Sequence, residues 1–153
     1  PIILASYTHF WLAEAALTMG VNADARALLK AGIELSLAKV ADFSGKAMDA
    51  AEVTNYVDTV LALYDAAGSN EDKLEIVIEE FYIASFGNSV EAYNNYRRTG
   101  YPVLGQSVIT NTEFPRSYYL PSSELNSNDN PALVQKKLTD QVFWDTNPAN
   151  FID

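Results

Sequence analysis

Apolar residues recur at three- and four-residue steps in four successive segments of this 153-residue chain, and short breaks separate the segments. This period matches one face of an α-helix, so each segment is predicted to form an amphipathic helix. The segments cover residues 2–19, residues 22–40, a stretch after Asp49 and a stretch from Asn70. Helices joined by short connections pack antiparallel, so we expect two helical hairpins.

Residues that stop and start helices lie at the breaks. Glycines, which favour helix C-caps, follow three of the segments: Gly20, Gly68 and Gly87. Asn22 is placed to cap the second helix, and Asp49 is followed three residues later by a glutamate, which is capping-box spacing. Asn88 has the same spacing and predicts a fifth, short helix that ends before Gly100.

The character of the sequence changes after Gly100. Residues 101–130 are rich in Pro, Ser, Asn, Thr and Tyr without a sustained period, which predicts an irregular segment. Asn130 and Pro131 are expected to open a short helix through Leu138, and the tail ends on three aromatic residues: Phe143, Trp144 and Phe151. We expect an all-α fold, with tetratricopeptide-like hairpins over residues 1–100 and an irregular segment, residues 101–153, packed on them.

Charge and composition exclude several classes of function. The 20 acidic and 10 basic side chains give a net charge of -10, which repels phosphate backbones, so no nucleic-acid partner is predicted. The chain has no cysteine, which excludes disulfides and thiolate chemistry. No run of about 18 apolar residues is present to span a membrane. Because the chain opens on Pro1 without a leader, we expect a part of a longer protein, with any lipid anchor upstream.

Candidate chemical groups are few. Glu75, Glu79 and Glu80 could suggest a glycosidase carboxylate pair, but a solvated acidic helix face is the favoured interpretation. His9 is the single histidine and lacks a sequence partner for a triad or a metal site. The oxygen-rich run 124–130 offers ligand types that calcium accepts, but such clusters usually form turns. We therefore predict no enzyme, no catalytic residue, no metal site and no cofactor.

One segment resembles a known family. Residues 86–102 read FGNSVEAYNNYRRTGYP, which closely resembles the C-terminal signature of the SusD/RagB family. Further similar segments follow in the family's order: residues 114–116, 120–124, 126–130 and 142–145. Residues 6–16 and 31–36 look like the family's last large helical pair. The resemblance covers nearly the whole chain, but only the C-terminal part of the family's pattern.

The resemblance implies a function. Family members are lipid-anchored at the cell surface on the bacterial outer membrane, and they form a lid on a SusC-like TonB-dependent transporter. The resemblance therefore implies a non-enzymatic subunit that binds a glycan, an oligosaccharide or another nutrient. It also implies that this subunit contacts the membrane only through an N-terminal lipid anchor absent from this chain. The alternative is a helical-repeat protein-interaction scaffold without a sugar site. Exposed aromatics paired with Asn, Asp or Gln would favour sugar, and a continuous apolar groove would favour a protein ligand.

Two interpretations remain open for the arginine pair. Four residues are candidate contacts for an anion or a sugar acid: Tyr93, Tyr96, Arg97 and Tyr101. In the structural interpretation, the arginines complete the dipole of a helix end and pin the irregular segment to the helices. The resemblance implies structural roles for seven motif residues: Arg97, Arg98, Gly100, Tyr101, Pro102, Trp144 and Asp145. Trp11 is expected in the core, and Trp144 is expected to anchor the tail.

Overall fold

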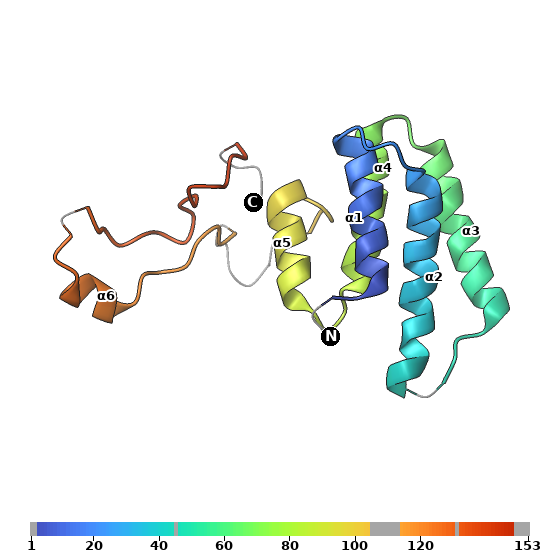
Figure 1. The fold of residues 1–153 in the computed structure, drawn as a ribbon, viewed down its shortest axis with the longest axis horizontal. Coiled ribbons are helices and arrows are strands. Elements are labelled where there is room, and N and C mark those ends of the chain that lie inside the picture. Colours follow the sequence, from blue (N-terminus) through green and yellow to red (C-terminus); the bar gives the residue numbers. More distant parts are fainter. Residues whose placement is uncertain (1–2, 45, 105–113, 131, 149–153) are drawn as a thin grey trace. The chain divides into compact units, whose positions relative to one another are not determined.

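The computed structural model describes residues 3–44, 46–104, 114–130 and 132–148 (Figure 1). The described residues form six helices and no strand, so the predicted all-α fold is confirmed. The helices are α1 (Ala5–Thr18), α2 (Ala25–Ser44), α3 (Ala50–Ala66), α4 (Asn70–Ala84), α5 (Ser89–Thr99) and α6 (Ser122–Ser127). The chain divides into two compact units, Pro1–Pro102 and Val103–Asp153, and α6 belongs to the second.

Side-chain caps fix where three of the helices begin, and at α4 the Ser69 hydroxyl accepts from the N–H of Asp72 at 3.1 Å. The Asp49 carboxylate accepts hydrogen bonds from the backbone N–H groups of Ala51 and Glu52, as the capping spacing predicts for the start of α3. For α2 the predicted cap, Asn22, is wrong. Asp24 instead accepts a hydrogen bond from the N–H of Ala27 at 3.0 Å, so the cap lies two residues past its expected position and the helix begins at Ala25.

α5 begins where the sequence predicts, but the predicted capping hydrogen bonds are not formed. Asn88 is the N-cap residue, but its side chain makes no capping hydrogen bond, so the predicted capping box is wrong. In such a box the glutamate three residues on would accept from the Asn88 N–H. That N–H already donates to the Ser85 carbonyl at 2.7 Å, so the turn leading out of α4 satisfies it.

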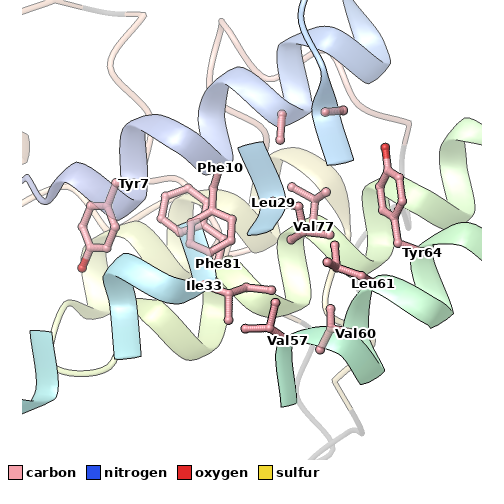
Figure 2. Close-up of a cluster of buried hydrophobic side chains, with 12 residues drawn as sticks. Tyr7, Phe10, Leu29, Ile33, Val57, Val60, Leu61, Tyr64, Val77 and Phe81 are labelled. Atoms are coloured by element: carbon pink, nitrogen blue, oxygen red, sulfur yellow. The ribbon is translucent and has the colours of Figure 1, made fainter. Parts of the chain in front are cut away.

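Aromatic packing forms the core of the first unit. α1 packs against α2 and α4, and α4 also contacts α3 and α5. Figure 2 shows the buried cluster, in which the rings of Phe10 and Phe81 stack with centroids 5.2 Å apart. Tyr7 and Trp11 pack on the same Phe81 ring, at 5.2 and 5.9 Å. The expectation that Trp11 belongs to the core is confirmed, since it packs against the buried cluster.

The second unit contains a helix where irregular chain was expected. α6 begins after Pro121, which sets the backbone at its N-cap, and ends where the N–H of Asn128 donates to the Glu124 carbonyl. The helix expected to run through Leu138 is wrong for the described residues 132–138. The Asn130 side chain accepts from the N–H of Ala132, which closes a turn. Pro131 and Phe151 lie outside the described residues.

Candidate functional site

The arginine pair lies in the last turn of α5, as the structural interpretation predicts. α5 ends at Gly100, whose φ of 76° is left-handed and whose N–H donates to the Tyr96 carbonyl at 2.8 Å. A residue with a Cβ is strained in that conformation, so the motif glycine is a helix stop. A cis peptide bond joins Tyr101 to Pro102 directly after it.

Arg98 connects two helices. Its guanidinium forms an ion pair with Glu14 of α1 and donates a hydrogen bond to the Asn95 side chain at 2.9 Å. The Glu14 side chain is 13% exposed and that of Arg98 is 45% exposed, so solvent screens the pair only in part. Arg98 therefore holds α5 to α1.

The four candidate ligand contacts have different surroundings. Arg97 lies over the ring of Tyr93, with its Cζ 5.3 Å from the ring centroid. Tyr96 is buried in the core at 6% exposure. The Tyr101 hydroxyl donates to Glu71 of α4 at 3.0 Å, and burial together with this hydrogen bond raises the pKa of Tyr101 to about 12. The structure thus pairs Tyr93 with Arg97 and buries Tyr96, while a ligand role for all four remains a proposal.

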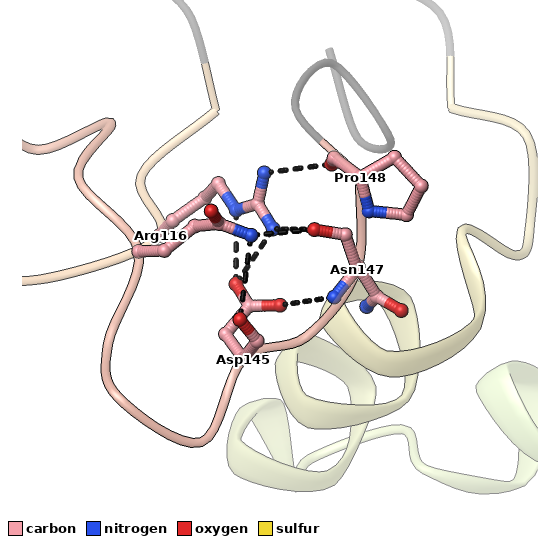
Figure 3. Close-up of polar contacts among 5 residues, drawn as sticks. Arg116, Asp145, Asn147 and Pro148 are labelled. Atoms are coloured by element: carbon pink, nitrogen blue, oxygen red, sulfur yellow. Dashed lines mark hydrogen bonds and ion pairs between the residues drawn. The ribbon is translucent and has the colours of Figure 1, made fainter.

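A buried ion pair organises the second unit (Figure 3). The Arg116 Nε and Nη2 atoms both donate to the Asp145 carboxylate, at 2.9 and 2.8 Å, and each side chain is 6% exposed. Arg116 also donates to the carbonyls of Asn147 and Pro148. Sequence reasoning gave Asp145 a structural role but missed its partner. The signal was an opposite charge within another family-like segment, residues 114–116.

The aromatic residues beside Asp145 are exposed. Phe143 and Trp144 pack edge to face with centroids 4.5 Å apart, and 63% of Trp144 is exposed. The tail was expected to be anchored by burial of Trp144. The anchoring contact in this segment is instead the hydrogen-bonded Asp145 carboxylate.

One of the three α4 glutamates for which a solvated acidic face was predicted is buried, so the prediction is wrong for Glu80. Glu80 is 8% exposed, whereas Glu79 is exposed and Glu75 is half-buried. The Tyr56 hydroxyl of α3 donates to both Glu80 oxygens, at 2.8 and 3.0 Å. The burial of Glu80 could have been inferred from its place in the sequence. Glu80 lies between Ile76 and Ile83 on the apolar stripe of the helix.

Two of the apolar grooves that open on the first unit offer room for a ligand. One, of about 550 Å³, lies among α2, α3 and α4, and Tyr56 and Glu80 form part of its wall. The other, of about 510 Å³, is lined by residues of α1, α2 and the turn after α4: Leu4, Tyr7, Val40, Phe43, Phe86, Gly87 and Asn88. Phe43 and Phe86 are 71% and 98% exposed, so this second groove presents aromatic rings to solvent.

The remaining candidates make local contacts. His9 lies within hydrogen-bonding distance of the Ala5 carbonyl, 2.8 Å from its Nδ1. In the run 124–130, the Asn128 side chain accepts from the N–H of Asn130 at 3.0 Å, the bond of an Asx turn. Across the described part of the chain, no group of three or more His, Asp or Glu residues gathers to hold a metal ion. No described helix is long and apolar enough to cross a membrane.

Comparison with known proteins adds family and fold. A SusD-like family model, described as SusD and RagB outer membrane lipoprotein, matches residues 2–135. Among solved structures, a SusD-like protein of Bacteroidetes AC2a matches 95% of this chain at a TM-score of 0.77 and 22% identity. A SusD homologue from Bacteroides fragilis matches 83% at a TM-score of 0.72 and 27% identity. A chitin-binding protein matches 94% at a TM-score of 0.76 and 28% identity.

This chain covers only a small part of the length of each relative. This chain spans 30% of the first two structures and 33% of the chitin-binding protein. A search of curated proteins gave no match. The family model nevertheless covers far more than half of this chain, and the helices superpose on solved members. The chain therefore belongs to the SusD-like family of outer membrane lipoproteins.

Proposed function

We propose that this chain is part of a non-enzymatic subunit that binds a glycan or another nutrient for an outer-membrane uptake system. The observation that carries the proposal is the family match over residues 2–135, together with 28% identity to a chitin-binding protein over 94% of the chain. The proposed partner is a SusC-like TonB-dependent transporter. The net charge of -10 suits a neutral glycan better than an anionic one.

The surroundings of the acidic residues support binding rather than glycoside hydrolysis. Hydrolysis requires two carboxyl groups that flank one bond. Glu80 faces Tyr56 inside a groove, while its neighbour Glu79 is exposed and projects about 100° away around the helix. These two carboxyl groups do not converge on one point.

The proposed place of action is the cell surface. The family model describes outer membrane lipoproteins, which supports anchoring of the full-length parent through an N-terminal lipid. In this proposal residues 1–100 act as a helical platform for ligand capture. Recovery of the parent together with its transporter from detergent-solubilised outer membranes tests the partnership, and a parent that elutes alone would contradict it.

Tyr93 and Arg97 are the proposed ligand contacts with the best-supported geometry. A guanidinium over a phenol ring combines an apolar face with several hydrogen-bond donors, which suits a sugar ring or a sugar acid. Tyr101 offers a hydroxyl that already donates to Glu71. Tyr96, buried in the core, contributes by holding α5 in place.

A glycan-array screen tests the proposal, using the full-length parent beside residues 1–153, with calorimetry on each hit. Binding by both places contacts in this chain, and Arg97→Ala should then weaken affinity about tenfold, the size of one lost charge-assisted hydrogen bond. Arg26→Ala is the matched control, since Arg26 is a surface arginine paired with Asp65. Binding by the parent alone places the site upstream. Silence from a folded parent would contradict glycan binding.

The second candidate function is a protein-interaction scaffold. The observation in its favour is the 510 Å³ groove with its exposed Phe43 and Phe86, because a continuous apolar groove suits a protein ligand. Loss of transporter binding in a Phe86→Asn variant, with glycan binding absent from both forms, would support this alternative.

A further inference from the structure

The groove among α2, α3 and α4 combines apolar walls with a buried carboxyl group. Its volume of about 550 Å³ is in the range of small-molecule sites. Five apolar side chains contribute to the walls: Ile33, Leu37, Met48, Val53 and Ile83. Glu80 and Tyr56 are the polar pair within it, and Ile33 is buried, which places it at the floor.

The Glu80 carboxylate is incompletely satisfied. A carboxylate accepts about four hydrogen bonds, but both Glu80 oxygens share a single donor, the Tyr56 hydroxyl. No ion pair to Glu80 is formed within the described residues. Buried carboxylates are ordinarily paired with a cation or with several donors, because burial alone disfavours the charge.

The charges around Glu80 add to this imbalance. Burial, foremost, and the nearby Glu79 carboxylate raise the pKa of Glu80, while the Tyr56 hydrogen bond lowers it. Burial and Glu80 likewise raise the pKa of Tyr56. From α3 the groove also receives Glu52, and the α2 wall contributes no ionisable side chain. Every ionisable group facing the groove is therefore an acid.

We propose that this groove binds an organic cation, a protonated amine carried on an apolar body. The ammonium donates to the free lone pairs of Glu80, and the apolar body packs against Ile33, Leu37 and Ile83. A charge-assisted hydrogen bond to the buried carboxylate of Glu80 supplies the attraction, and burial of the hydrocarbon adds to it. This ligand class is separate from the glycan of the proposed function, and neither proposal depends on the other.

A pair of probes tests the proposal on the unaltered chain. Phenethylamine carries the ammonium, and 2-phenylethanol has the same body with a neutral hydroxyl. In methyl-resolved NMR spectra, phenethylamine should shift the methyl signals of Ile33, Met48 and Ile83 in a saturable manner. The alcohol should bind at least about tenfold more weakly, since it lacks the charge. Absence of shifts with the amine, or equal affinities for the two probes, would overturn the proposal.

Two variants that remove the same charge locate the site. Glu80→Gln should weaken phenethylamine binding about tenfold, whereas Glu79→Gln, one residue away and exposed, should leave it within a factor of two. Equal losses in both variants would mean general attraction to an acidic protein and would overturn the proposed site. The comparison of phenethylamine with 2-phenylethanol uses the native chain. It therefore tests cation binding even where a variant does not fold.

Discussion

Two buried carboxylates in this chain are stabilised in different ways. Asp145 accepts two hydrogen bonds from the Arg116 guanidinium on one carboxylate oxygen, so its charge is neutralised inside the second unit. Glu80 has one neutral donor, the Tyr56 hydroxyl, and a second acid beside it. The Arg116–Asp145 pair is stable only while both charges are present. The folded chain would be more stable if Glu80 lost its charge. The two residues therefore give opposite predictions.

Glu80 should make the chain less stable as pH rises. Folding raises the pKa of Glu80, mainly through burial, so the folded state binds its proton more tightly than the unfolded state does. Stability contributed by this group is present below the ordinary carboxyl pKa and is lost as pH rises through the folded pKa. Glu80→Gln should therefore raise the free energy of unfolding at neutral pH by about 1 kcal/mol, and by less in acid.

Urea unfolding of the native chain, Glu80→Gln and Glu79→Gln across a pH series measures this effect. Glu79 is exposed and only adds to the effect of burial on the pKa of Glu80, so its variant should keep a weaker pH dependence of the same sign as the native chain. A Glu80→Gln variant that is less stable than the native chain at neutral pH would mean that the carboxylate itself is needed there.

Asp145→Asn should destabilise the second unit. The substitution keeps the side-chain shape but leaves the Arg116 guanidinium buried without a counter-charge, at a cost of about 3 kcal/mol. Hydrogen exchange reports it directly, because the N–H groups of Arg116 and Ser117 donate to the Leu138 carbonyl at 2.7 and 2.9 Å. Both amides should exchange faster in the variant.

The matched control is Asp65→Asn on the first unit. Asp65 receives two hydrogen bonds from Arg26 at 2.7 and 2.8 Å, one on each carboxylate oxygen, but about half of each side chain is exposed. Water and salt screen such a pair, so little change is expected. Equal effects of the two substitutions would show that burial does not set the strength of the Arg116–Asp145 pair.

At the level of helices and strands, the sequence predicts structure well where the apolar period is long. The stripes of α1 to α4 each run over several turns, and a satisfied polar cap fixes the beginning of α3 as its spacing predicts. The prediction is wrong for α6, which lies in a segment expected to be irregular, and for residues 132–138, where hydrogen bonds from distant residues set the backbone. Leu138 illustrates this, since its carbonyl accepts from Arg116 and Ser117 and not from a helical neighbour.

Gly32 sets how closely α1 and α2 pack. A Cβ placed on Gly32 would lie 3.0 to 3.2 Å from three ring atoms of Phe10, which is fully buried and stacked on Phe81. Gly32→Ala should gain about 1 kcal/mol of helix propensity but lose more through overpacking, for a net loss of about 1 to 2 kcal/mol. Urea unfolding measures the sum. Ala38→Gly, at an exposed position of α2, calibrates the propensity alone, and a stabilised Gly32→Ala would show that the ring can move aside.

Across the whole molecule, the family could be recognised from sequence because its motif residues are contiguous in α5. The buried sites could not, since Glu80 with Tyr56 and Arg116 with Asp145 each join residues 24 or more positions apart. A helical period gives the face on which a residue lies, but not which partner another helix brings to it. Burial of Glu80 follows from the position of α3, which a single sequence does not specify.

The exposed aromatic groove should make residues 1–153 self-associate in isolation. Phe86 is 98% exposed beside Phe43, so burying these rings against a second copy removes apolar surface from water. Sedimentation velocity should show association that increases with concentration, and Phe86→Asn should weaken it about tenfold. Phe143→Asn is the matched control, because Phe143 is 92% exposed but belongs to the other unit. Equal weakening by both variants would indicate non-specific contact between exposed rings, and a monomeric native chain would show that the groove does not bind a second copy.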